Sequence, residues 1–208
     1  MKYPAQPELV LGTRNPKKQI ELERLLAPYH IPVLSLADFS NALEVDESGT
    51  TFAENAALKA TQQARHLGRW VIGEDSGLCV AALAGSPGVR SARFSDPGAT
   101  DSRNNEKLLD LLKDTPLDAR QAWYVCQVTL ADPSGQVAIA CEGECRGRII
   151  SEYRGQGGFG YDPLFEIIEY HQTFAELGLA VKSMISHRAR AMRQFLQRLL
   201  QLEAFFRA

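Results

Sequence analysis

The chain has 208 residues, of which 45% are hydrophobic and 23% are charged, and its formal net charge is −2. These values fit a globular protein built as one large domain or a two-lobed one, and the small charge argues against a general nucleic-acid binder. No apolar run approaches the roughly 20 residues needed to cross a bilayer, so no membrane association is expected. Residues 1–4 lack a signal-peptide core, and we therefore expect a cytoplasmic protein.

The chain begins with a predicted strand, loop and helix. Residues 8–12 are expected to form the strand, and the helix should run to about Leu26, with Asn15 as its N-cap and Pro16 as its first residue. Such a helix start can bind phosphate, because its backbone N–H groups and its dipole both favour an anion. A lysine-rich helix start exposed to solvent is the open alternative, and the glycine spacing of a Walker loop is missing. The candidate phosphate-binding residues are Thr13, Arg14, Asn15, Pro16, Lys17 and Lys18.

A second strand is expected over residues 31–36, and a second helix should follow an acidic loop. Thr51 and Glu54 have the spacing of a capping box, in which each side chain binds the backbone N–H of the other residue. This cap accounts for Glu54 without any chemistry. Within the predicted helix, Asn55 and Lys59 lie one turn apart on the same face.

The central stretch covers residues 71–78, where an apolar run leads into two adjacent carboxylates. We expect a short buried strand that ends at a functional turn, with Gly77 allowing the backbone to turn. Neighbouring side chains on extended backbone point to opposite faces, so Glu74 and Asp75 should have different surroundings. A carboxylate at the end of a strand can hold a divalent cation or activate water, although an acidic turn exposed to solvent is the simpler interpretation.

The second half of the chain contains a predicted hairpin. The residues at 85–88 break the chain, and helical patterning returns over residues 101–112. Residues 122–131 alternate between apolar and polar side chains, and residues 137–141 repeat this pattern on a returning strand. Because this hairpin interrupts the alternation of strands and helices, we expect a mixed sheet bent into two lobes with a cleft between them.

Four cysteines are too few to staple a chain of this size. A hairpin turn over residues 132–135 would bring Cys126 and Cys141 opposite each other, which leaves a disulfide between them open. In the expected compartment we favour buried thiols.

A glycine-rich loop at residues 155–160 formally matches the dinucleotide-binding pattern. That pattern requires a strand before it and a helix after it, whereas Pro163 dictates extended backbone here. We expect instead a flexible loop that presents Phe159 to stack on a base and Asp162 to accept from ring N–H groups. A glycine turn that carries two core aromatics, Phe159 and Tyr161, is the alternative.

A cationic segment over residues 182–190 should start the C-terminal helix, with Ser186 placed to cap it. Cations oppose the dipole at a helix N-terminus, so several of them together indicate a ligand, with chance surface charge as the alternative. The cationic residues are Lys182, His187, Arg188 and Arg190.

Taken together, these segments resemble the inosine/xanthosine triphosphate pyrophosphatases, a family that clears deaminated purine nucleotides. The resemblance covers nearly the whole chain. The matching segments are, in the family's order, TRNPKK (13–18), GTTFAENA (49–56), EDSGL (74–78), PGVRSAR (87–93), GFGYDP (158–163) and ISHR (185–188).

The resemblance implies a fold and a reaction. The fold would be α/β, with residues 1–208 forming one two-lobed domain: an elongated mixed β-sheet flanked by helices, with a central nucleotide-binding cleft. The implied assembly is a homodimer. The implied reaction is Mg²⁺-dependent hydrolysis of a nucleoside triphosphate (ITP, dITP or XTP) to the monophosphate and pyrophosphate.

The resemblance also implies roles for individual residues. Asp75 would bind metal and accept a proton, and Asp46 or Glu47 would complete the metal site. The residues implied to hold phosphate and ribose are Thr13, Arg14, Asn15, Pro16, Lys17, Lys18 and Ser76. Those implied to surround the base are Phe159, Gly160, Tyr161, Asp162, Lys182, His187 and Arg188.

Two positions depart from the family pattern. Arg14 stands where glycine is usual, and it could crowd the phosphate loop or add a contact. Glu74 replaces the Asp that is common in bacterial members.

The implied chemistry is physically coherent. Attack on a triphosphate depends on positioning and charge neutralisation, which metal-holding carboxylates and lysines provide. Lys182 and Arg188 are donors only, and they suit the O6 acceptor of hypoxanthine or xanthine better than adenine's exocyclic amine. Guanine also has O6, so these donors do not separate it from hypoxanthine.

Three other functions compete with a pyrophosphohydrolase. One is a less selective nucleotide phosphatase that releases orthophosphate, and another is a non-catalytic nucleotide sensor. A nucleic-acid-binding module is the third, and it fits the charge balance least.

Overall fold

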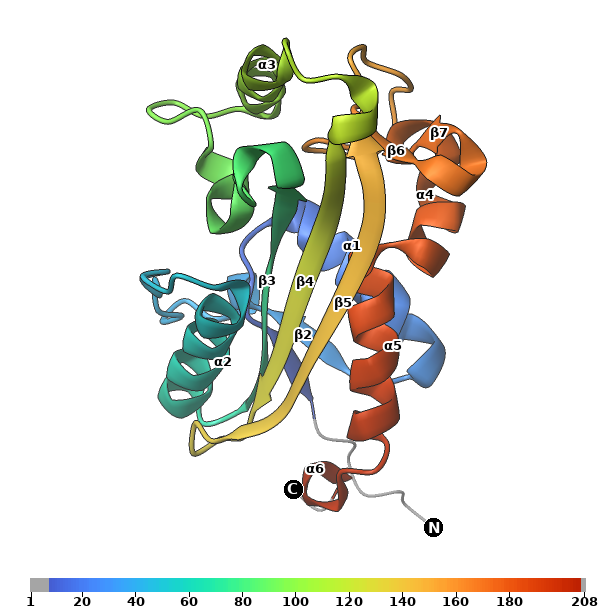
Figure 1. The fold of residues 1–208 in the computed structure, drawn as a ribbon. Helices are drawn as coiled ribbons and strands as arrows, with labels where there is room; N and C mark the ends of the chain where they lie inside the picture. The colour runs from blue at the N-terminus through green and yellow to red at the C-terminus, as the bar shows by residue number, and fades with distance from the viewer. Residues whose placement is uncertain (1–7, 207–208) are drawn as a thin grey trace. The chain divides into compact units, whose positions relative to one another are not determined.

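The computed structural model describes residues 8–206. The prediction that residues 1–4 lack a signal-peptide core lies outside these residues. The described residues form a mixed seven-stranded sheet in the order β2-β1-β3-β4-β5-β6-β7 (Figure 1). The strands are β1 (Leu9–Leu11), β2 (Val33–Ser35), β3 (Trp70–Val80), β4 (Gln121–Ala131), β5 (Val137–Ile149), β6 (Phe165–Ile167) and β7 (Gln172–Thr173). The α-helices are α1 (Pro16–Leu26), α2 (Phe52–Leu67), α3 (Asp101–Leu112), α4 (Phe174–Ile185), α5 (His187–Leu199) and α6 (Glu203–Phe206).

The sheet is mixed, as predicted. β1 pairs in parallel with both β2 and β3, whereas β6 pairs antiparallel with β5 and with β7. The predicted hairpin is confirmed as β4 and β5, and the helix predicted over residues 101–112 is confirmed as α3. The α/β class is therefore confirmed.

The chain divides into two compact units. The first contains the described residues up to Asp75, together with Gln127–Glu142 and the residues from Arg190 onward. The second contains Ser76–Cys126 and Gly143–Ala189. Three strands, β3, β4 and β5, each contribute residues to both units.

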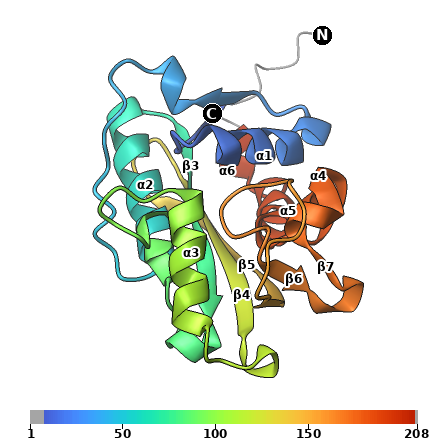
Figure 2. The ribbon, with the colours of Figure 1, turned by 90° about the horizontal axis from the view of Figure 1, so that it is seen from above.

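In the first unit, α2 packs directly on β3, and the two lie side by side in Figures 1 and 2. The capping box at Thr51 and Glu54 starts this helix as predicted, and its buried face includes Ala60. The close approach depends on Gly73, because a Cβ atom there would lie 2.1 Å from the carbonyl oxygen of Ala56. Small residues on both elements thus set the distance between the helix and the strand.

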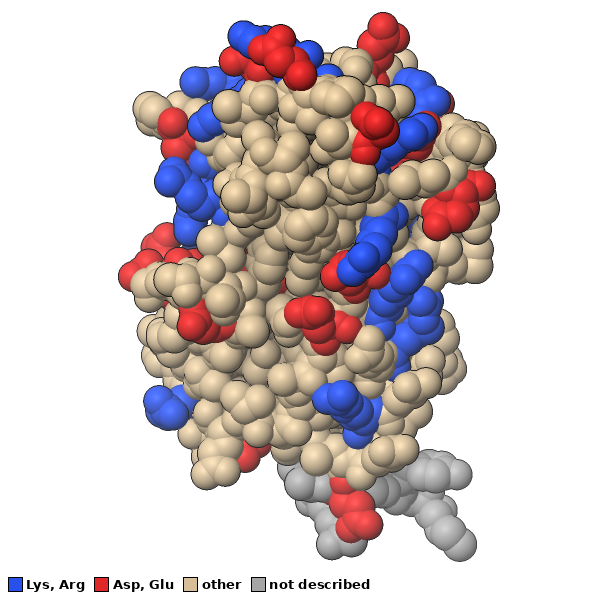
Figure 3. Space-filling model, in the orientation of Figure 1, with Lys and Arg blue, Asp and Glu red and all other residues tan. Residues whose placement is uncertain are grey.

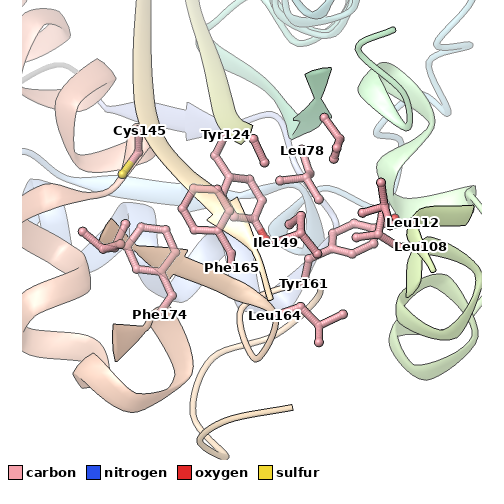
Figure 4. Close-up of a cluster of buried hydrophobic side chains, with 13 residues drawn as sticks. Leu78, Leu108, Leu112, Tyr124, Cys145, Ile149, Tyr161, Leu164, Phe165 and Phe174 are labelled. Atoms are coloured by element: carbon pink, nitrogen blue, oxygen red, sulfur yellow. The ribbon is translucent and has the colours of Figure 1, made fainter. Parts of the chain in front are cut away.

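The second unit has a core of aromatic and aliphatic side chains (Figure 4). The rings of Tyr124 and Phe165 lie 4.7 Å apart, and those of Phe165 and Phe174 lie 5.3 Å apart. Tyr161 lies next to Leu108 of α3 in the same cluster. This packing joins the loop that precedes β6 to α3.

One prediction about the central strand is wrong. β3 does not end at an acidic turn; it continues through Glu74 and Asp75 to Val80. Beyond the partly buried Ser76, Leu78 and Val80 are apolar and buried, so the strand continues into the core of the second unit. Gly77 does not have a positive φ angle. It therefore lies within extended backbone and not in a turn.

Three further features bear on the predictions. All four cysteines of the chain fall within residues 8–206, and they are buried and form no disulfide there. No helix among these residues is long and apolar enough to cross a membrane. On the face drawn in Figure 3, basic and acidic side chains are interspersed.

Candidate active site

The N-terminus of α1 is capped as the sequence predicts. Asn15 Oδ1 accepts from the backbone N–H groups of Lys17, at 3.0 Å, and Lys18, at 3.3 Å. Thr13 Oγ1 in turn accepts from the N–H of Asn15 at 3.1 Å, and Pro16 occupies the first turn. The cap therefore uses two of the backbone donors at this helix end, those of Lys17 and Lys18.

Arg14 contacts a neighbouring loop. Its Nη2 atom donates to the carbonyl oxygen of Ala42 at 2.9 Å, and the side chain is exposed. The guanidinium of Arg14 therefore bonds to the protein's own backbone.

Glu74 has a clear electrostatic partner. Its side chain is only 1% exposed, and its Oε2 atom lies 2.8 Å from Nζ of Lys18. A buried carboxylate without a counter-ion would be strongly destabilising, so Lys18 accounts for the presence of Glu74 in the strand. The pair also fixes Lys18 beside β3.

Asp75 is held by two residues of α2. Nζ of Lys59 lies 2.9 Å from Asp75 Oδ1, and Asn55 Nδ2 donates to Asp75 Oδ2 at 3.3 Å. Lys59 also lies 3.2 Å from Oε2 of Glu47 and so joins the acidic loop to the strand. Sequence reasoning did not assign Asn55 and Lys59 to the site. The signal was their spacing of one turn, which places two polar residues on the face of α2 that buries its alanines.

Burial and charge shift the pKa values of this pair. Burial raises the pKa of Asp75 from 3.8 by more than the attraction of Lys59 and Lys18 lowers it. Burial also acts to lower the pKa of Lys59, but the attraction of Asp75 and Glu47 outweighs it and raises this pKa above 10.5. Lys59 therefore stays protonated, and Asp75 becomes a better proton acceptor than an exposed aspartate.

The donors around Lys59 suit a hard cation. Glu47 and Asp75 each place a carboxylate oxygen within 3.2 Å of one ammonium group, whereas Asp46 is exposed on the same loop. Within residues 8–206, no group of three or more His, Cys, Asp or Glu side chains could hold an ion together. Mg²⁺ is commonly bound through one or two carboxylates that are completed by substrate phosphates, and Glu47 and Asp75 fit that pattern.

A second cluster lies in the second unit. Nζ of Lys182 lies 2.6 Å from Oδ2 of Asp162, and both side chains are buried. The same oxygen accepts from the backbone N–H of Phe159 at 2.9 Å, and Lys182 Nζ lies 4.6 Å from the centre of the Phe159 ring. An aromatic face, a cation and a carboxylate are thus packed together.

Tyr161 has a structural position. It is 3% exposed, and its hydroxyl donates to the carbonyl oxygen of Ser91 at 2.8 Å. The alternative interpretation, a core aromatic, therefore describes Tyr161, while Phe159 is only partly buried. Gly160 lies between them with φ of +63°.

The cationic segment spans two helices. Lys182 lies in the last turn of α4, which sequence reasoning missed, and α5 begins at His187. Ser186 caps α5 as predicted, because its Oγ atom accepts from the N–H of Ala189 at 3.2 Å. His187 and Arg188 therefore lie at a capped helix N-terminus, as the sequence predicts.

The side chains of His187 and Arg188 are buried within the second unit. The His187 ring stacks on Tyr124, with centroids 4.6 Å apart. Arg188 is 2% exposed, and its Nη2 atom donates to Oγ of Ser76 at 3.0 Å. The alternative of chance surface charge is wrong for His187 and Arg188, because both are buried in ordered contacts.

Comparison with known proteins identifies relatives along most of the chain. Residues 9–198 match the model of the Ham1 family. A dITP/XTP pyrophosphatase from Rhodopirellula baltica is 54% identical over 94% of this chain and 94% of its own length. One from Desulforamulus reducens is 47% identical over 94% of this chain and 96% of its own length. The solved structure of a HAM1 protein from Coxiella burnetii is 36% identical, covers 94% of this chain and 99% of its own, and superimposes with a TM-score of 0.86.

Proposed function

The chain belongs to the Ham1 family, and from this premise we propose that it hydrolyses deaminated purine nucleoside triphosphates, namely ITP, dITP and XTP. The products are the nucleoside monophosphate and pyrophosphate. The relatives named dITP/XTP pyrophosphatase, at 54% and 47% identity, support the substrate class. The observation that carries the reaction type is Asp75, a buried carboxylate with a raised pKa that is bonded to a lysine.

The phosphate chain is assigned to the first unit. Lys18 and Lys59 supply positive charge, and Thr13, with the helix start that follows it, adds polar contacts. Mg²⁺ is the proposed cofactor, held by Asp75 and Glu47, and when bound it would neutralise charge on the phosphate oxygens. Asp75 accepts the proton of the attacking water, a role that its raised pKa favours. Asp46 remains a candidate for a further metal contact from the same loop.

The base is assigned to the second unit. Phe159 offers a face on which a purine can stack, and Lys182 beside it can donate to O6. His187 and Arg188 supply further donors, and Ser76, which is bonded to Arg188, is assigned to the ribose side. Adenine would face these donors with its own amino group, which leaves buried groups unpaired and selects against it.

Assembly and location complete the proposal. The family resemblance favours a homodimer in the cytoplasm. It favours neither a nucleic acid nor a membrane as a partner. Size-exclusion chromatography with light scattering would test the assembly, and a monomer at working concentration would refute it.

The test of the reaction is a product assay. The protein is incubated with inosine triphosphate and Mg²⁺, and pyrophosphate and orthophosphate are quantified separately from the first turnover onward. Pyrophosphate is the expected product, and orthophosphate as the first product would favour the phosphatase instead. Asp75→Asn should abolish turnover, whereas Asp110→Asn, a matched change at an exposed position of α3, should leave it intact. Equal turnover by both variants would refute the role of Asp75.

A further inference from the structure

The loop that carries Phe159 and Asp162 is held at its middle residue by α3. The N–H of Gly160 donates to Oδ2 of Asp101 at 3.0 Å, and its carbonyl oxygen accepts from Nδ2 of Asn105 at 3.0 Å. Asp101 and Asn105 lie one turn apart, so one face of the helix binds both polar groups of one peptide residue. Gly160 has φ of +63°, a conformation that other residues rarely adopt.

Asn105 is a polar residue on a buried helix face. It is 3% exposed and lies on the buried face of α3, which also contains Leu108 and Leu112. Its Oδ1 atom has no hydrogen-bond partner among the residues that the structure describes. An unsatisfied buried acceptor costs stability, and residues that break a packing rule in this way are often kept for function.

The neighbouring Asn104, in comparison, has a structural role. It is equally buried, but its Nδ2 donates to the carbonyl oxygens of Ser91 and Ala92, and its Oδ1 accepts from Ser95. Its polar groups are used to hold the segment before α3. Asn105, in contrast, contributes a single bond, and that bond goes to Gly160.

A displacement of Gly160 would also move the residues on both sides of it, including Phe159 and Asp162. Phe159 is bonded through its N–H to Asp162, which in turn holds Lys182. The position of the aromatic face relative to the lysine therefore depends on the backbone between Phe159 and Asp162. We propose that Asp101 and Asn105 are positioning residues that fix Gly160 and thereby set discrimination between purine bases, an inference that rests on the proposed function.

The first experiment compares steady-state kinetics of four variants on inosine and adenosine triphosphates. Asn105→Leu and Asp101→Ala each remove one bond to Gly160, whereas Asp101→Asn retains an acceptor and should rescue. Ser102→Ala is the matched control, because the Ser102 hydroxyl donates to Glu106 within α3. Displacing a binding group by about 1 Å can cost up to about 100-fold. We expect KM for inosine triphosphate to rise about tenfold in the two disrupting variants, with kcat within about threefold.

The readout that separates positioning from stability is the ratio of kcat/KM between the two substrates. This ratio should fall about tenfold in Asn105→Leu and Asp101→Ala and stay at the wild-type value in Asp101→Asn and Ser102→Ala. Equal losses for both bases, accompanied by a lower melting temperature, would overturn the inference. Asp101 is exposed, so Asp101→Ala keeps the test decisive even where Asn105→Leu does not fold.

A second experiment does not depend on catalysis. Hydrogen exchange of the peptide covering residues 155–164 is measured in the nucleotide-free protein. Exchange should accelerate in both disrupting variants, because Asp101→Ala removes the acceptor of the Gly160 N–H and Asn105→Leu removes the donor to the Gly160 carbonyl oxygen. Unchanged exchange would overturn the inference. A wild-type chain that releases no pyrophosphate would refute the proposed function and, with it, base discrimination, while the exchange data would still decide whether α3 fixes the loop.

Discussion

Replacing Lys59 with methionine keeps most of the aliphatic chain but removes the cation that Glu47 and Asp75 share. At the observed 2.9 Å from Asp75, Coulomb's law with an effective dielectric constant of about 20 gives on the order of 6 kcal/mol before desolvation is counted. The two side chains are 12% and 8% exposed, so the desolvation of each charge offsets part of this attraction. Breaking a buried pair typically costs about 3–5 kcal/mol. Because Lys18 still attracts Asp75, we expect a loss near the lower limit, about 3 kcal/mol at pH 7.

This loss in the free energy of unfolding should depend on pH. The folded pKa of Asp75 already lies above its unfolded value, and removal of Lys59 raises it further. A carboxyl group with a raised folded pKa costs no stability below its unfolded pKa, and the cost grows as pH rises towards the folded pKa. The difference between the wild type and Lys59→Met should therefore shrink as pH falls from about 7 towards about 4.

Urea unfolding at both pH values measures this difference, and a double-mutant cycle with Asp75→Asn isolates the pair. The expected coupling energy is about 2–3 kcal/mol at pH 7 and less at the lower pH. A coupling energy near zero, or a loss that is the same at both pH values, would refute the assignment of Lys59 as the counter-ion of Asp75.

Two further predictions concern packing and charge. Gly73→Ala should lower the free energy of unfolding by more than about 3 kcal/mol and lower activity, because the new Cβ would lie 2.1 Å from the carbonyl oxygen of Ala56 and push α2 away from β3. The control is Gly68→Ala, whose new Cβ meets no atom within 4 Å and which should cost only about 1 kcal/mol in a thermal unfolding assay. Equal losses in the two variants would contradict this account. Burial acts to raise the pKa of Glu166, but hydrogen bonds from two arginine side chains outweigh it and lower the pKa from 4.5. Its stabilisation is therefore present above the unfolded pKa and lost as pH falls through the folded pKa. Glu166→Gln should cost about 2 kcal/mol at pH 7 and almost nothing once the pH lies below the folded pKa. An unchanged loss in acid would exclude the ion pairs.

Local sequence signals predicted the parts of the fold that depend on few residues. Asn15 and Pro16 identified the start of α1, and Thr51 with Glu54 identified the start of α2. The alternation around the turn that begins at Asp132 predicted β4 and β5. In each case neighbouring residues satisfy one another's hydrogen bonds, so the pattern is visible without the fold.

Other features depend on contacts between residues far apart in the chain. β3 continues past Asp75 because its second half is buried in a core that no local pattern reveals. α4 was missed because Gly178, with φ of +73°, interrupts its helical pattern. The bond between Arg188 and Ser76 joins residues 112 positions apart. Sequence motifs named these residues as candidates, but only the structure shows which side chain contacts which.

The site also contains residues that the motifs did not assign. Lys59 was noted only for its spacing from Asn55, and the structure shows both bonded to Asp75. Their role depends on the close packing of α2 at Gly73, which cannot be read from α2 alone. Glu74 had no assigned role until Lys18 was found beside it.

We propose that the buried Asp75, with Lys59 and Lys18 as its neighbouring cations, promotes cleavage of a purine nucleoside triphosphate between its α- and β-phosphates. The most direct test is a time course of inosine triphosphate hydrolysis in ¹⁸O-labelled water, with mass analysis of both products. Pyrophosphate together with inosine monophosphate, formed in equal amounts from the first turnover, is the predicted result. Orthophosphate together with inosine diphosphate would contradict the account.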